Sequence, residues 1–323
     1  MPTSMMITNR NVTGNQLGED LADLTYYVSD QTDLMSLDHW TKLELIDFRD
    51  RLVQIARQFP KIEDTNNEQQ KHVSILLHGY NETWTDAVKL YQSIQGNLYA
   101  DTDGLGQLIL FTWPSQGHTW DYLPDRDEAA SSRSGIAQVF VNLHDFLVAA
   151  QRAAAKPNGS SPPCRAKISV IAHSMGNFVL QKALASAAKM LNSPQLITLI
   201  HQCAMVAADV DNDIFPKSLP LDSDGSLMAN LCYRISALYT GRDQVLGASA
   251  GLKHFGTRRL GRSGLADPNT VHDNVFDCDV TNLIPANAPD IHSAVFENQK
   301  TLDLLRLILI GRDRNLLPVP PEP

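Results

Sequence analysis

A serine, an aspartate and a histidine stand in an order along this chain that suits nucleophilic catalysis. Ser174 is the centre of the segment Ala172-His173-Ser174-Met175-Gly176, a variant of the pattern G-x-S-x-G with alanine in the first place. A serine hydroxyl is a weak nucleophile, so it needs a base that takes its proton and a carboxylate that orients the base. Asp243 and His292 follow the serine in the order that such a set requires. These three residues would together support acyl transfer through the serine oxygen.

The residues on either side of Ser174 predict the sharp turn that such a nucleophile requires. Residues 168–172 form a short apolar run typical of a buried strand, and residues 177–184 are typical of a helix. A strand, a small-residue turn and a helix are the context of a nucleophile elbow, whereas Ser-x-Gly alone would be an ordinary turn. Because helix N-termini stabilise negative charge, the backbone N–H of Met175 is predicted to contribute to an oxyanion hole.

The base has to come from one of the histidines that follow the elbow, which are His201, His254, His272 and His292. His201 lies inside an apolar strand-like run and is interpreted as structural. His292 follows the last predicted strand through a proline-rich turn, which is where the base of such a set belongs. His272 is the next choice, and His254 lies in a basic loop.

The carboxylate is predicted to be Asp243, which follows the predicted strand at residues 231–239. Asp209 and Asp211 follow the preceding predicted strand and are rivals, because a carboxylate one strand earlier can also reach the histidine. Chain order does not decide between them. Helix N-capping or loop hydrogen bonding is the alternative role of Asp209 and Asp211. Arg242, beside Asp243, is interpreted as a solvated charge.

The segment His78-Gly79-Tyr80-Asn81 directly follows a predicted buried strand at residues 72–77. A glycine just past the carboxyl end of a strand lets backbone N–H groups turn toward a ligand. In folds built around a nucleophile elbow, the loop at this place donates the second N–H of the oxyanion hole, and Tyr80 is the candidate donor. A simple β–α turn is the alternative interpretation.

Apolar runs that alternate with amphipathic segments predict an α/β protein with a mainly parallel sheet and helices on both faces. Strands are expected at residues 24–28, 72–77, 107–113, 168–172, 196–206, 231–239 and 274–280, and helices at residues 37–59, 83–99, 125–155, 177–184 and 292–309. Residues 1–24 are interpreted as irregular and residues 247–270 as a long loop. We predict one domain over residues 1–323 with its core at about 20–312, the N-terminal segment and proline-rich C-terminal tail being peripheral.

The composition is that of a soluble globular protein. Of 323 residues, 43% are hydrophobic and 20% charged, and the net charge of −9 argues against a nucleic-acid-binding surface or a polybasic membrane patch. The four cysteines are widely separated, which predicts no disulfide framework and no zinc site. The first residues lack the features of a signal peptide, and no apolar run approaches the roughly 20 residues needed to span a bilayer. A cytoplasmic location without an integral membrane segment is the default expectation.

Seven segments, taken in order, resemble those of the α/β hydrolases, and more narrowly those of a branch of that superfamily whose function is unknown. They are HGYN (78–81), FTWPSQG (111–117), AHSMGN (172–177), AADVDNDIF (207–215), LYTGRDQVL (238–246), RLG (259–261) and His292-Ser293. The resemblance implies an α/β-hydrolase fold with Ser174, Asp243 and His292 as a catalytic triad. Such a triad needs neither a metal nor an organic cofactor. The resemblance to this branch does not indicate a particular substrate.

The expected reaction is hydrolysis of a small-molecule ester or acyl compound. Thioesterases, peptidases and acyltransferases use the same triad, and a non-catalytic binding protein with this fold is the alternative from another class. His78, Trp113 and His173 are candidates for substrate contact. The loop at residues 115–124 is expected either to line the pocket or to form an aromatic cluster, and the arginine-rich segment at residues 253–262 suggests a weaker hypothesis of an anion-binding site.

Overall fold

The fold is described from a computed structural model, which covers residues 3–61, 66, 68–100, 103–115, 134–146, 148–149, 166–191, 198–253 and 256–318. Within these residues nine strands form one sheet in the order β3-β2-β1-β5-β4-β6-β7-β8-β9. The strands are β1 (Ser4–Thr13), β2 (Gln16–Ser29), β3 (Thr41–Leu43), β4 (His72–Leu77), β5 (Gly106–Thr112), β6 (Lys167–His173), β7 (Ile200–Val206), β8 (Cys232–Tyr239) and β9 (Val275–Asp279).

Most of the sheet is parallel. Strands β1 and β5, and every neighbouring pair from β5 to β9, run parallel, whereas β2 is antiparallel to both β1 and β3. The central strands are nearly continuous apolar runs, as expected for strands that are buried on both faces. Because these strands are parallel, their carboxyl ends meet at one edge of the sheet, and this edge is where loops from distant parts of the chain come together.

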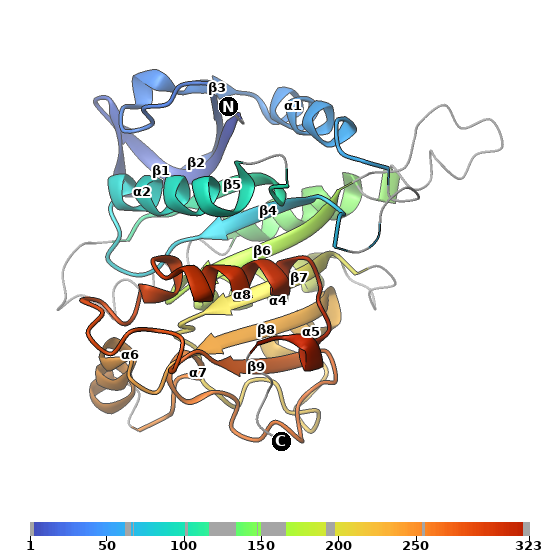
Figure 1. Cartoon of the computed structure of the whole chain (residues 1–323). Helices are drawn as coiled ribbons and strands as arrows, with labels where there is room; N and C mark the ends of the chain where they lie inside the picture. Colours follow the sequence, from blue (N-terminus) through green and yellow to red (C-terminus); the bar gives the residue numbers. More distant parts are fainter. Residues whose placement is uncertain are drawn as a thin grey trace.

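Helices cover both faces of the sheet. They are α1 (Leu45–Arg57), α2 (Trp84–Ile94), α4 (Gly176–Met190), α5 (Asp224–Leu231), α6 (Gln244–Ala248), α7 (Leu260–Ser263) and α8 (Gln299–Leu309), and residues 134–146 are also helical. In Figure 1, α2 and α8 cross the near face and α4 lies behind the sheet. Two hydrophobic clusters correspond to these faces, one holding apolar residues of α2 and α8 and the other those of α4 and α5. The predicted architecture, a mainly parallel sheet with helices on both faces, is therefore confirmed.

The N-terminal residues differ most from the sequence-based expectation. The prediction that residues 1–24 are irregular is wrong, because β1 and β2 form a hairpin whose first strand lies against β5. Met5 and Met6 are fully buried, and Thr8, Asn9 and Arg10 are buried beside them. These polar residues hide the strand pattern in the sequence, since the burial of Thr8 and Arg10 depends on hydrogen bonds and not on apolarity.

Several helix boundaries also differ. The helix predicted at residues 37–59 begins at Leu45, after a 3₁₀ turn and β3, and the last helix begins at Gln299, so that His292 lies in a turn. The segment predicted as a long loop contains α7 and part of α6, and α5 was not predicted. The pocket loop beyond Ser115, the linker before β6, His254 and Cys164 lie outside the described residues.

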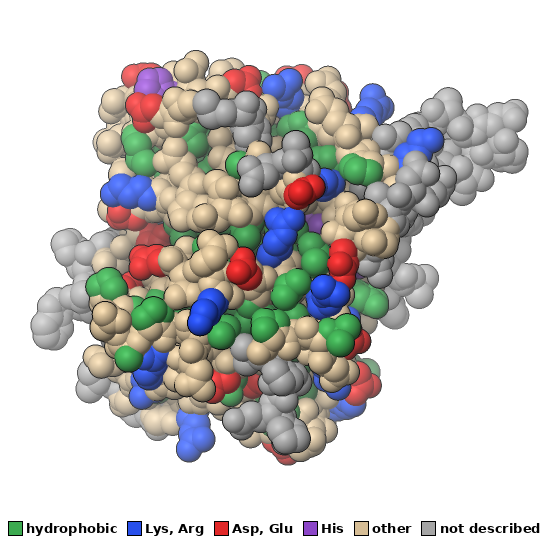
Figure 2. Space-filling view, in the orientation of Figure 1, with side chains coloured by type: hydrophobic (Ala, Val, Ile, Leu, Met, Phe, Trp, Pro, Cys, Tyr) green, Lys and Arg blue, Asp and Glu red, His purple; other side chains and the backbone are tan. Residues whose placement is uncertain are grey.

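Surface and core are consistent with an ordinary globular protein. The cysteines of the described residues, Cys203, Cys232 and Cys278, are buried free thiols, and burial raises the pKa of Cys278 to about 12. Acidic and basic side chains are interspersed on the face seen in Figure 2. Among the helices that the structure describes, none combines the length and apolarity needed to cross a bilayer. The same residues contain no cluster of three or more side chains suited to hold a metal ion.

Candidate active site

Ser174 lies in a strained turn between β6 and α4. Its backbone has φ of 50°, a left-handed conformation that is uncommon for residues other than glycine and that clusters at functional sites. Two hydrogen bonds hold this conformation, from the Ser174 N–H to the Val206 carbonyl at 3.0 Å and from the Asp209 N–H to the Ser174 carbonyl at 3.1 Å. The turn is thus fastened to the end of β7 and to the loop that follows it. This is the geometry of a nucleophile elbow.

Gly176 is required by the close approach of α4 to the end of β4. A Cβ atom on Gly176 would lie 2.4 Å from the His78 carbonyl oxygen and 2.9 Å from that of Leu77. No side chain fits there, which explains the last residue of the motif. Ala172, in the first place of the motif, is fully buried in β6, where its methyl group is accommodated.

The side-chain amide of Asn177 forms hydrogen bonds to the backbone of the elbow, a role that the sequence analysis did not predict. Its Nδ2 donates to the carbonyl oxygens of Ala172 at 2.9 Å, Ser174 at 3.1 Å and Val206 at 3.3 Å. The side chain is fully buried, so this amide holds the strand, the turn and the neighbouring strand together. The only signal in the sequence is an asparagine in the first turn of an otherwise apolar helix.

Asp243 and His292 form a short hydrogen bond at the same edge of the sheet. His292 Nδ1 lies 2.6 Å from Asp243 Oδ2, and the carboxylate is fully buried. The other carboxylate oxygen accepts from the Leu246 N–H at 2.9 Å, so that Asp243 also caps α6. Arg242 is not the solvated charge that the sequence suggested, because it donates to the carbonyl oxygens of Thr281 and Ile284 at 2.5 Å. It thereby ties the Asp243 turn to the segment leading to His292.

The electrostatics around His292 favour a basic imidazole. Burial by itself would lower the pKa of His292, but the hydrogen bond and the charge of Asp243 raise it, with further contributions from Asp290 and Asp209. The net effect is a pKa above the ordinary value of 6.5. A carboxylate on Nδ1 also holds that proton in place and leaves Nε2 as the proton acceptor.

His292 reaches the elbow through His173. The two rings are 4.9 Å apart between centroids, and His173 Nε2 lies 3.4 Å from the His292 carbonyl oxygen. Among the hydrogen bonds of the described residues, none joins Ser174 to His292. Catalytic hydrogen bonds of ligand-free enzymes are often long and tighten only when substrate binds. The structure therefore joins Asp243 to His292 and places the His292 ring beside His173, the residue that precedes Ser174.

The two predicted oxyanion donors lie on either side of the elbow. The Met175 N–H, just before α4, makes no backbone hydrogen bond to any described residue. Tyr80 lies between two residues with fixed N–H groups, since Gly79 donates to Glu82 Oε1 at 3.2 Å and Asn81 donates to Ser115 Oγ at 2.8 Å. A Cβ on Gly79 would lie only 3.0 Å from that of Ser174, so this loop is packed directly against the nucleophile.

His78 and Trp113 do not fit the substrate-contact role predicted for them. Both side chains are fully buried, and their rings stack at 5.3 Å. The Trp113 N–H donates to His78 Nε2 at 3.1 Å, and His78 Nδ1 lies 2.9 Å from the Gly79 carbonyl oxygen. Burial lowers the pKa of His78 to about 4, so the ring is neutral at physiological pH. His78 and Trp113 therefore support the loop around Tyr80 from the interior of the protein.

Among the hydrogen bonds of the described residues, none joins the side chain of a remaining candidate to the imidazole of His292. Asp209 Oδ1 accepts from Arg259 Nε at 2.7 Å, and Asp211 contacts the same guanidinium. Arg259 is buried in these bonds, which contradicts an exposed anion site at this arginine. His272 Nε2 lies 3.4 Å from Ser226 Oγ, and His201 lies at the start of β7, toward the opposite edge of the sheet.

A doubly covered, mainly parallel sheet with a strained serine at the end of its central strand defines an α/β hydrolase. Residues 56–275 match the family described as alpha/beta hydrolase of unknown function (DUF900), and the chain belongs to this family. Ser174, Asp243, Tyr80 and Met175 lie inside the matched residues, whereas His292 lies beyond them.

Solved structures resemble this chain only remotely. Lipase B from Aspergillus fumigatus shares 12% identity with a TM-score of 0.40, covering 93% of this chain and 63% of that one. The phospholipase PlaB from Legionella pneumophila, solved in complex with thio-NAD, shares 13% identity with a TM-score of 0.26, covering 60% of this chain and 44% of that one. This chain therefore spans less than two thirds of either protein, and neither likeness carries an argument about substrate. No curated protein matches the sequence.

Proposed function

We propose that this protein is a serine hydrolase that cleaves carboxylic esters through Ser174, His292 and Asp243. The observation that carries the proposal is the 2.6 Å bond between His292 Nδ1 and the buried Asp243, made beside a serine held at φ of 50°. A carboxylate-bound imidazole of raised pKa next to an elbow serine is suited to take and return a proton.

The reaction would proceed through an acyl-enzyme. Ser174 Oγ attacks the ester carbonyl carbon while His292 Nε2 takes the serine proton, and Asp243 stabilises the imidazolium. The N–H groups of Met175 and Tyr80 hold the oxyanion, where the loss of one donor costs roughly 100- to 1,000-fold in rate. His292 then protonates the departing alkoxide.

Hydrolysis of the acyl-enzyme repeats the same proton transfers with water. A water molecule attacks the acyl carbon, His292 takes its proton, and the returning proton restores the Ser174 hydroxyl as the carboxylic acid leaves. This scheme takes a small-molecule ester or acyl substrate. Thioesters, amides and acyl transfer to another acceptor use the same steps with a different leaving group or acceptor.

The test is covalent labelling with a fluorophosphonate probe. Wild type should be labelled, Ser174→Ala should not be, and His292→Ala should be labelled far more slowly. His272→Ala is the matched control, because His272 was the second choice for the base and lies apart from Asp243; its labelling rate should equal that of wild type. A panel of p-nitrophenyl esters and thioesters of rising chain length then separates the substrate classes.

Two results would contradict the proposal. Labelling that survives Ser174→Ala would mean that another residue is the nucleophile. A folded wild type that neither reacts with the probe nor turns over any ester or thioester would instead favour a non-catalytic binding protein.

A further inference from the structure

We propose that Arg10 and Glu19, from the N-terminal β1–β2 hairpin, are positioning residues that hold the loop at residues 79–82 in place for oxyanion binding. This inference rests on the proposed function. The loop carries Tyr80, the predicted second donor of the oxyanion hole. The hairpin lies far from it in sequence and supplies none of the reacting groups.

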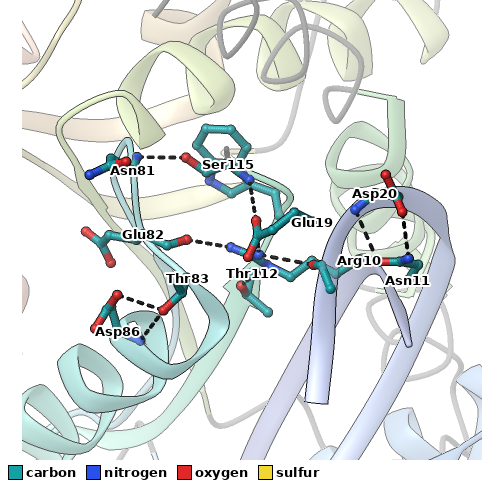
Figure 3. Close-up of polar contacts among 12 residues, drawn as sticks. Arg10, Asn11, Glu19, Asp20, Asn81, Glu82, Thr83, Asp86, Thr112 and Ser115 are labelled. Carbon is teal, nitrogen blue, oxygen red and sulfur yellow. Dashed lines mark hydrogen bonds and ion pairs between the residues drawn. The ribbon is translucent and has the colours of Figure 1, made fainter. Parts of the chain in front are cut away.

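Arg10 reaches one end of the loop directly. Its guanidinium is fully buried, and Nη2 donates to the Glu82 carbonyl oxygen at 2.8 Å. Nε donates to Thr112 Oγ1 at 2.9 Å, and Nη1 donates to Glu19 Oε2 at 2.5 Å. Figure 3 shows the guanidinium between Glu82 on one side and Glu19 on the other. A planar group with several fixed donors is well suited to set such a geometry.

Glu19 reaches the residue before Glu82, Asn81, through Ser115. Glu19 Oε2 accepts from the Ser115 N–H at 3.2 Å, and Ser115 Oγ accepts from the Asn81 N–H at 2.8 Å. Asn81 has φ of 58°, which closes the loop into a tight turn. The same chain of contacts runs from Glu19 to Asn81 in Figure 3.

The two arms and the Asn81–Glu82 backbone form a closed ring directly after Tyr80. Glu82 is bound to Arg10, Arg10 to Glu19, Glu19 through Ser115 to Asn81, and Asn81 is next to Tyr80. Beyond this ring, the Glu82 side chain reaches back past Tyr80, where its Oε1 accepts from the Gly79 N–H at 3.2 Å. The peptide groups on either side of the one that carries the Tyr80 N–H are therefore fixed, the Asn81 N–H by Ser115 and the Gly79 N–H by Glu82. Gly79 also packs on Ser174.

The hairpin comes from outside the part of the chain that defines the family. The family match covers residues 56–275, which include the loop and Ser115 but neither Arg10 nor Glu19. The loop is thus held in this protein by an element beyond the matched region.

A misplaced donor should lower kcat and leave KM nearly unchanged, because the oxyanion forms in the transition state and the tetrahedral intermediate and is absent from the bound substrate. Displacement by about 1 Å can cost on the order of 100-fold. We expect Ser115→Ala and Glu19→Ala to lower kcat by about 10- to 100-fold on p-nitrophenyl butyrate. Arg10→Lys should do the same, because one ammonium cannot make the contacts of a guanidinium.

The affinity for an alkyl trifluoromethyl ketone should fall in parallel, since its adduct with Ser174 carries the oxyanion. The pH midpoint of kcat/KM should not move, because the ring leaves His292 and Asp243 untouched. The variants should also be non-additive when combined, as expected for one connected network. Glu68→Ala is the matched control, because it breaks the 2.8 Å ion pair with Arg312 away from the active site; its kcat should equal that of wild type.

Ser115→Ala removes a single oxygen and keeps the fold. This variant therefore tests the inference even where Arg10→Lys is unstable. The inference is wrong if wild type is labelled and active while Ser115→Ala and Glu19→Ala keep its kcat and its affinity for the ketone. A loss of kcat matched in the Glu68→Ala control would show general destabilisation and also overturn it. If wild type is inactive and unlabelled, the proposed function fails first, and the inference with it.

Discussion

Two carboxylate–histidine pairs lie beside the elbow, and they differ in how tightly they are joined. His292 Nδ1 is 2.6 Å from the buried Asp243, whereas His173 Nδ1 is 3.5 Å from Glu82 Oε1 and has no hydrogen-bond partner among the described residues. The Glu82 carboxylate is directed to the Gly79 N–H instead. The two pairs therefore differ in geometry, although each places a histidine near a carboxylate.

The pKa shifts of His292 and Glu82 also differ between the two pairs. Burial acts against the charged form of both His292 and Glu82, but in each case local partners outweigh it. Asp243 raises the pKa of His292, while the contacts of Glu82 with His173, with His78 and with the Gly79 N–H lower the pKa of Glu82. The first pair thus favours the charged form of its histidine, and in the second pair the carboxylate stays charged and accepts from a loop N–H.

The largest expected effect comes from breaking the tighter pair. Asp243→Asn should lower kcat by about 10⁴-fold, because the amide no longer holds the imidazole in the correct tautomer or stabilises its charge. Steady-state kinetics on p-nitrophenyl butyrate measure this, with circular dichroism as the control for folding. A loss below tenfold would mean that Asp243 is not the partner of the base.

The looser pair should respond to the shape of the side chain and not to its charge. Glu82→Ala should lower kcat by about 10- to 100-fold, since the Gly79 N–H loses its acceptor and the loop relaxes. Glu82→Gln should restore most of the rate, because its amide oxygen can still accept that bond. Equal losses in Glu82→Ala and Glu82→Gln would instead indicate that the negative charge takes part in catalysis.

The pH dependence sharpens the comparison further. His292 acts as a base only when neutral, and its pKa is raised, so kcat/KM should fall as the pH drops through a midpoint above 6.5. Asp290→Asn removes one of the charges that raise this pKa and should shift the midpoint to lower pH. Glu82→Gln is the control and should leave it in place. A midpoint that shifts in Glu82→Gln would instead assign the titrating group to the Glu82–His173 pair.

The smallest effect is expected at His173. His173→Gln removes a ring that packs on His292 but has only one weak polar contact with it, so we expect a loss of kcat within about tenfold. Rates measured at saturating p-nitrophenyl butyrate test this. A loss as large as that of Asp243→Asn would make His173 part of the proton transfer.

The sequence predicts best where a single local pattern determines the structure. Strand β4 matches its predicted limits, because a buried parallel strand is a continuous apolar run. The elbow was predicted for the same reason, as strand, turn and helix follow one another directly. His292 and Asp243 were predicted as a pair from chain order and resemblance, and the structure places them in contact.

What the sequence does not predict depends on partners that are distant in the chain. Arg10 and Asn177 look like ordinary polar residues, yet each is buried because it donates to backbone carbonyl oxygens supplied by other elements. The same is true of Glu82, whose acceptor role is fixed by a loop turn and not by a pattern. In the sequence, such contacts show only as a polar residue among apolar ones. That pattern does not identify the residue's hydrogen-bond partner.

The position of β1 beside β5 has a consequence for biosynthesis. The bond from Arg10 to Thr112 spans 102 residues, so the hairpin leaves the ribosome long before its neighbour exists. At about 5 to 20 residues per second, this interval lasts on the order of 5 to 20 s. During that time the apolar residues Met5, Met6 and Ile7 lack their strand partner and form an open, aggregation-prone edge. The segment that supports the loop in the finished protein is thus the one that waits longest, among the paired strands of the sheet, for its neighbour to be synthesised.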